Sequence, residues 1–221
     1  MLTDASRREK PKGVGTKAVK KVPVPRRKKG PDSGDNSNTQ YALLGLRACI
    51  DAGIAIPADV LPRTELWWVK DQEKDGGWGY SRQAMAGTRK APYGPMVAGG
   101  VSSVAICCAY TGKPWKNHAS VLGGLGWLAQ NFSIDKIPKY DDKYRWLYYY
   151  LYSLERAGVL TGMEKLGPHA WYPQGAQFIL AGQKPNGSWT DGDDPVAETC
   201  FAILFLRRAT KPLAKSYSPG K

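Results

Sequence analysis

One pattern of four residues, an aromatic residue followed by glutamine, glycine and tryptophan, occurs twice in this chain with identical spacing. In chain order the two sets are Trp67, Gln72, Gly76 and Trp78, and then Phe178, Gln183, Gly187 and Trp189. A partial copy between them keeps the aromatic residue, as Trp127, but has Phe132 where the glutamine is expected. The three aromatic residues lie 60 and 51 residues apart, a period typical of stacked helical repeats. The repeat therefore predicts a series of helical pairs.

Elementary chemistry gives this pattern a structural role. A glutamine near the end of a helix has an amide that can bond the free carbonyls there, and the glycine allows the chain to reverse. The tryptophan that follows buries a large ring and keeps one N–H donor for the loop. We therefore expect Trp78 and Trp189 to join neighbouring repeats and to take no part in chemistry.

The hydrophobic pattern predicts seven helices and almost no β-structure. Four segments are apolar on nearly every side, as in helices surrounded by protein; these predicted inner helices span 38–53, 97–112, 143–158 and 196–208. Three segments with a narrower apolar stripe alternate with them; these predicted outer helices span 58–72, 117–130 and 168–183. We expect Gly53, Gly112 and Gly158 to end three of the inner helices as left-handed cap residues.

The net charge of +13 is concentrated at the N-terminus, where residues 1–34 hold eleven Lys or Arg and three acidic residues. This segment has no helical or strand period, so we expect a disordered basic arm over 1–35, a helical repeat domain over 36–210 and a flexible tail over 211–221. The basic stretch 7–29 suits nucleic acid or anionic lipid. No aromatic residue is interleaved there to stack on bases, so a solvated extension is the preferred interpretation.

The sequence contains neither a long apolar run nor an apolar stretch behind the N-terminal charges. We therefore expect no transmembrane segment and no secretory signal, and a cytoplasmic location. The four cysteines lie in apolar helical pattern without the spacing of a zinc or redox site, which predicts buried thiols; they are Cys49, Cys107, Cys108 and Cys200.

The two complete sets resemble the QW repeats of the squalene–hopene cyclase and oxidosqualene cyclase family, which shares an α/α toroid with protein prenyltransferase β subunits. The stretches "YALLGLRAC", "DGGWGY", "YYLYSLERAG" and "ETCFAILFL" are similar to bacterial prenyltransferase/squalene oxidase repeat proteins. The resemblance covers about residues 36–210 and implies an all-α toroid of inner and outer helices. A complete toroid has six helical pairs and this chain supplies three and a half, which implies a partial ring or an edge covered by a partner.

The resemblance also draws attention to Asp191, Asp193 and Asp194, which spell the DxDD motif of hopene-type cyclases. There the motif implies a general acid that protonates an alkene, a role that needs a carboxyl held protonated by its neighbours. In this chain Pro195 and Val196 follow the motif where the family has Thr-Ala. The favoured interpretation is a helix start in which Asp194 is the cap and Pro195 the first helical residue.

The aromatic residues of two inner helices are candidates for a cavity wall, in which ring faces attract cations or pack on apolar ligands. Core packing is the simpler interpretation for several of them. A carboxylate on an otherwise apolar inner helix, Glu198, must be paired, protonated or open to a cavity. The predicted ligand-lining residues are Glu198, Trp146, Tyr148, Tyr149, Tyr152 and Phe201.

No cofactor or metal site is predicted. Prenyltransferase β subunits bind zinc through Asp, Cys and His, but Glu198 stands in place of the histidine, and His118 and His169 have no partner at ligand spacing. The segment 79–95 carries Arg82, Arg89 and Lys90 and suits an anion at a cavity mouth, or a merely solvated loop. The sequence thus predicts a helical repeat domain that binds an apolar or protein ligand among its inner helices, with a DxDD cyclase as the alternative.

Overall fold

The computed structural model describes residues 34–81, 91–141, 146–190, 192 and 194–213. Regular structure within these ranges is helical, apart from one isolated β-bridge between Leu166 and His169. The elements are α1 (Asn36–Asp51), α2 (Val60–Asp71), α3 (Gly94–Tyr110), the 3-10 turn η1 (Trp115–Asn117), α4 (Ala119–Gln130), α5 (Leu147–Thr161), α6 (Trp171–Ala181) and α7 (Pro195–Leu206). The seven predicted helices are confirmed within the described residues.

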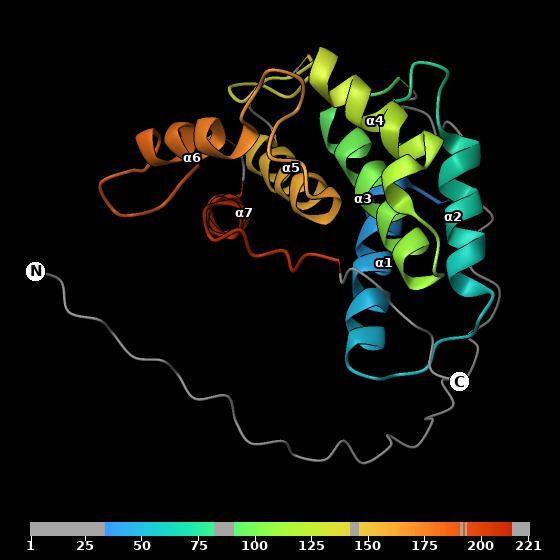
Figure 1. Cartoon of the computed structure of the whole chain (residues 1–221). Helices are drawn as coiled ribbons and strands as arrows, with labels where there is room; N and C mark the ends of the chain where they lie inside the picture. Colours follow the sequence, from blue (N-terminus) through green and yellow to red (C-terminus); the bar gives the residue numbers. More distant parts are fainter. Residues whose placement is uncertain (1–33, 82–90, 142–145, 191, 193, 214–221) are drawn as a thin grey trace, which may run out of the picture.

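The predicted inner helices pack against one another in chain order. Helix α3 contacts α1 and α5, and α5 contacts α7, while the outer helices α2, α4 and α6 each pack on an inner neighbour. Figure 1 shows α3 at the centre of a group made by α1, α2, α4 and α5, with α6 and α7 on the far side of α5. The described chain is thus a row of inner helices with outer helices behind it.

Burial differs between the middle and the ends of this row. Nearly every residue of α3 and α5 is buried, as the sequence predicts for inner helices. The prediction is wrong for α1 and α7, which bury one stripe each and leave the other face open, with Ile203 46% exposed. The reason is position, because a helix at the end of a row has a neighbour on one side only.

Two of the three predicted glycine caps are confirmed. Gly53 and Gly112 follow α1 and α3 with φ of 79° and 75°, in the left-handed region that favours glycine. The prediction for Gly158 is wrong, since α5 continues to Thr161 and ends at Gly162, whose φ is 68°. Gly158 instead leaves room for the Trp171 ring, because a Cβ there would lie 2.4 Å from that ring.

The two glutamine–glycine–tryptophan turns have the same hydrogen bonds. Nε2 of Gln72 donates to the carbonyl of Gly76 (2.8 Å), and Nε2 of Gln183 donates to that of Gly187 (3.0 Å). In each turn the indole N–H donates back to the preceding outer helix, from Trp78 to Trp68 O (2.8 Å) and from Trp189 to Ile179 O (2.6 Å). These bonds correct the sequence analysis, which paired the amide with the helix carbonyls and the indole with the loop. The tryptophan ties the turn to its own helix.

The first turn also joins neighbouring repeats, as predicted for Trp78. Its ring is fully buried between α3 and α4, where Cβ atoms added to Gly100 and Gly124 would lie 2.5 and 2.7 Å from it. Gln72 Nε2 donates in addition to Ser120 O of α4 (3.0 Å), and Trp127 Nε1 donates to the Asp75 carboxylate (3.1 Å). Trp127 of the partial repeat thus binds the first glutamine–glycine–tryptophan turn through Asp75.

Three further predictions concern the cysteines, the N-terminal arm and the C-terminal tail of the chain. Cys107 and Cys108 are buried, but Cys49 is half-buried and Cys200 exposed, because α1 and α7 are end helices. Leu213 is buried and Arg47 donates to the carbonyls of residues 211 and 212, so the start of the predicted tail packs on α1. Residues 1–33 of the predicted basic arm 1–35 lie outside the described residues, while Asp35 caps α1. No described helix has the length and hydropathy to cross a bilayer.

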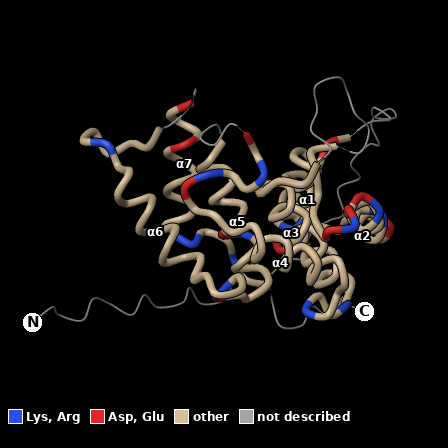
Figure 2. The backbone as a smooth tube through the Cα atoms, turned by 90° about the horizontal axis from the view of Figure 1, so that it is seen from above, with Lys and Arg blue, Asp and Glu red and all other residues tan. Residues whose placement is uncertain are grey.

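Charges on the described chain are mixed in sign. Figure 2 shows Lys, Arg, Asp and Glu together on α2, whereas α3, α4 and α6 contain no charged residue. Among the described residues, the apolar and aromatic side chains of the inner helices are therefore the main candidates for binding.

Gly76 and Gly187 are a matched pair for testing the contact between the first turn and α4. Both have left-handed φ, 87° at Gly76 and 83° at Gly187, but a Cβ at Gly76 would lie 2.5 Å from the Gly123 carbonyl oxygen, whereas the nearest atom at Gly187 is 4.0 Å away. Gly187→Ala should therefore lower the free energy of unfolding by about 1–2 kcal/mol through backbone strain alone. Gly76→Ala should lower it by roughly 2–5 kcal/mol, because α4 must also move. Urea denaturation measures both, and equal losses would contradict the close contact between repeats.

Candidate functional site

A cavity among the described residues has a volume of about 620 Å³ and a wall rich in aromatic residues. Five of its lining residues are tyrosines, and a tryptophan, a phenylalanine and a methionine add apolar surface. The lining residues are Ser37, Tyr41, Tyr80, Tyr93, Pro95, Met96, Ile137, Tyr140, Trp146, Tyr149 and Phe201.

The cavity lies where the inner helices begin. Ser37 and Tyr41 belong to the first turns of α1, Met96 to the first turn of α3 and Tyr149 to the first turn of α5. Phe201 from the middle of α7 completes the wall. All four inner helices therefore contribute to one space, although they are far apart in sequence.

Ring contacts hold the wall in place. Tyr93 stacks on Tyr140 with ring centroids 5.3 Å apart, and Tyr149 meets Phe201 edge to face at 5.7 Å. Tyr41 stacks on Tyr149 at 6.2 Å. Such aromatic pairs are worth about 0.5–1.5 kcal/mol each beyond the area they bury, so the wall is largely formed before any ligand arrives.

The polar atoms of the wall are neutral. Burial raises the pKa of Tyr149 to about 12, and its hydroxyl accepts a hydrogen bond from Nε2 of the buried Gln40 (2.5 Å). Ser37 Oγ lies 3.3 Å from the same hydroxyl. The wall thus offers ring faces and uncharged hydroxyls. Such a wall suits apolar, unsaturated or cationic groups of a ligand.

Three of the six predicted ligand-lining residues reach this cavity, namely Trp146, Tyr149 and Phe201. The others lie elsewhere. Tyr148 is buried with its hydroxyl toward Gly182 after α6, and Tyr152 stacks on Phe201 behind the wall. Glu198 is buried and accepts from the Gly192 N–H (3.3 Å), so it holds the loop before α7.

Most of the cavity wall was missed in the sequence. Tyr41 lies in α1, and Tyr80 lies just after the first glutamine–glycine–tryptophan turn. Tyr93 lies in the loop just before α3, and Tyr140 lies in the loop before α5. A signal existed for Tyr41, which lies in the first turn of a predicted inner helix. No local pattern marks the loop tyrosines, because only the folded chain brings them to the helix ends.

The structure assigns Asp194 of the DxDD string to helix capping. Its carboxylate accepts from Ala197 N (3.0 Å), Pro195 begins α7 as predicted, and the residue is exposed. The favoured interpretation of Asp194 as a helix cap is therefore confirmed. Asp191 and Asp193 lie outside the described residues, as do Arg82, Arg89 and Lys90, so their proposed roles stay predictions.

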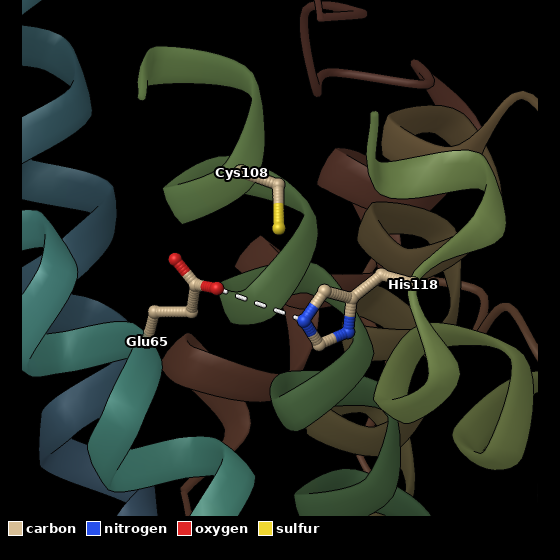
Figure 3. A group of neighbouring side chains, drawn as sticks. All are labelled: Glu65, Cys108 and His118. Carbon is tan, nitrogen blue, oxygen red and sulfur yellow. Dashed lines mark ion pairs between the residues drawn. The ribbon is translucent and has the colours of Figure 1, made fainter. Parts of the chain in front are cut away.

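One group of side chains has metal-ligand chemistry, and the sequence analysis missed it because its members come from three different segments. Glu65 of α2, Cys108 of α3 and His118 before α4 bring an oxygen, a sulfur and a nitrogen within 4.8 Å of one another (Figure 3). Zinc accepts such a donor set. Spacing along the chain gave no sign of this group.

Two of the three donors of this group, Glu65 and His118, have hydrogen bonds within the protein. Lys113 Nζ donates to both oxygens of Glu65 (2.9 and 2.7 Å), a bond that raises the pKa of Lys113. The Ser120 N–H donates to Nδ1 of His118 (3.2 Å), which places the proton of a neutral imidazole on Nε2, beside Glu65. Burial raises the pKa of Cys108 to about 11. The group therefore acts here as a polar link between α2, α3 and α4.

Comparisons of the chain with protein-family models, with curated proteins and with solved structures gave no match. The family resemblance therefore rests on the sequence repeats, and the site must be judged by its own geometry.

Buried thiols and phenols predict a loss of stability in alkali. Burial raises the pKa of Cys107 from 9.0 to about 12 and that of Tyr149 from 10.0 to about 12. At a pH between the ordinary pKa values and the raised ones, the unfolded chain releases protons that the folded chain keeps. The free energy of unfolding therefore falls as the pH rises from 9 to 12. Cys107→Ala should make this fall shallower. Urea denaturation across that pH range measures it, and parallel profiles for the two proteins would contradict the assignment.

Proposed function

We propose that this chain is an α/α-repeat domain of the squalene cyclase and prenyltransferase type, whose inner helices bind an elongated apolar ligand. Support for the architecture comes from the alternation of inner and outer helices and from the two glutamine–glycine–tryptophan turns with equal hydrogen bonds. In this proposal the row from α1 to α7 is an arc of a toroid, and its concave side carries the ligand.

The single observation that carries the function is the cavity shared by all four inner helices. Its volume of about 620 Å³ lies in the range of pockets that enclose small organic ligands. The wall of packed rings offers flat apolar faces, which suits a chain with methyl branches and double bonds. The hydroxyls of the wall are uncharged, so an apolar body meets no unpaired charge among the described lining residues.

Farnesol, a neutral branched alcohol with three double bonds, is a suitable probe. We expect isothermal titration calorimetry to detect one binding site, and Phe201→Ala to weaken binding roughly tenfold or more, because a buried phenylalanine ring contributes about 1.5–3 kcal/mol. Ile203→Ala is the matched control: Ile203 lies on the same helix, is 46% exposed and does not line the cavity.

Two results would contradict the proposal. One is the absence of any binding to the folded wild-type chain. The other is equal weakening by Phe201→Ala and Ile203→Ala, which would place the alcohol on the open face of α7 and outside the cavity.

A further inference from the structure

A buried cation, Arg156 of α5, lies behind the cavity wall. It is 1% exposed, and its Nη2 atom donates to Gln40 Oε1 (2.8 Å) and Ser153 Oγ (2.9 Å). Among the described residues its buried Nε and Nη1 atoms have no partner within hydrogen-bond geometry, although the Tyr41 hydroxyl interacts with the guanidinium. The neighbouring carboxylate of Glu155 accepts from Thr210 N (3.2 Å) and Oγ1 (2.6 Å) instead.

This arrangement is unusual because a buried guanidinium is normally paired. Removing a cation from water costs several kcal/mol unless an anion or a full set of acceptors replaces the water. The rings of Tyr152 and Tyr41 flank the guanidinium carbon of Arg156 at 4.3 and 5.2 Å, and cation–π attraction offsets about 2 kcal/mol of that cost. Nε and Nη1, which together carry three N–H groups, have no partner among the described residues, and such groups call for an explanation.

The position of Arg156 connects it to the cavity. Tyr41, which covers one side of the guanidinium, also lines the cavity and is 39% exposed. Gln40, which holds Nη2, donates to the hydroxyl of the lining residue Tyr149 (2.5 Å). Arg156 thus lies one ring beyond the wall, and rotation of the partly exposed Tyr41 side chain would open its free nitrogens to the cavity.

We propose that Arg156 is the anchor for an anionic head group on the cavity ligand. The guanidinium offers its positive charge and one donor, Nε or Nη1, to an oxygen of a carboxylate or a phosphate. The ligand is then an amphiphile, with an apolar chain against the aromatic wall and an oxyanion on Arg156. This inference rests on the proposed function of the cavity.

The test compares probes that differ in the head group alone: dodecanol, dodecanoate and dodecyl phosphate, each below its micelle concentration. Calorimetry with the wild-type chain should show tighter binding of at least one anionic probe than of dodecanol. Arg156→Met should weaken binding of that anion roughly tenfold to a hundredfold, the range for hydrogen bonds to charged groups, and leave dodecanol binding unchanged. Arg47→Met is the control, because Arg47 is also a buried arginine but donates to main-chain carbonyls of residues 211 and 212.

Stability separates this role from a merely structural one. Arg156→Met removes the cost of burying a charge but also the hydrogen bonds to Gln40 and Ser153, so its melting temperature should change little. If that variant does not fold, Arg156 is structural and the proposal is wrong. Arg156→Lys is a second variant: it keeps the charge, so it should retain more of the affinity for the anion than Arg156→Met.

The outcomes distinguish the two proposals. Binding of dodecanol with no preference for either anion would overturn the role of Arg156 and leave the cavity function standing. Binding of none of the three probes would overturn both. An anion preference that survives in the methionine variant would place the head group elsewhere and overturn the anchor. Tighter binding of dodecyl phosphate than of dodecanoate, or the reverse, would identify the head group as a phosphate or as a carboxylate.

Discussion

The indole N–H bond from each turn to its own outer helix is the interaction on which the arrangement depends. Trp78 and Trp189 both donate to a carbonyl ten residues earlier, and the glutamine amide fixes the glycine between them. Because the turn cannot swing away from its outer helix, the next inner helix starts at a defined place. Helices α3 and α7, which follow the two turns, then share one cavity with the first turns of α1 and α5.

The sequence was most informative where a local rule decides the structure. The helix alternation, the caps at Gly53 and Gly112 and the start of α7 at Asp194 and Pro195 each follow from composition over a few residues. The prediction for Gly158 was wrong because a glycine can end a helix or leave room for a neighbouring ring. The sequence alone does not show that Trp171 packs against Gly158. Burial of α1 and α7 was overestimated for a related reason: apolar pattern does not reveal which helices end the row.

The candidate site was predicted only in part, for the same physical reason. Trp146, Tyr149 and Phe201 were named because aromatic residues crowd their helices. Tyr93, Tyr140 and Arg156 were missed, because their roles come from contacts between segments distant in sequence. The group of Glu65, Cys108 and His118 was missed likewise, and its bonds to Lys113 and Ser120 explain it as a link between helices. Long-range contacts, unlike caps and turns, leave no local trace.

The central claim is that the cavity of the inner helices is where this protein binds its ligand, and covalent mapping tests it most directly. A long-chain alcohol carrying a photoreactive diazirine would be irradiated with the folded protein and the modified peptides sequenced by mass spectrometry. The account predicts adducts on cavity residues such as Tyr41, Tyr149 and Phe201, reduced by excess farnesol. Adducts confined to the exposed apolar residues Leu180 and Val196, with the cavity residues unmodified, would contradict it.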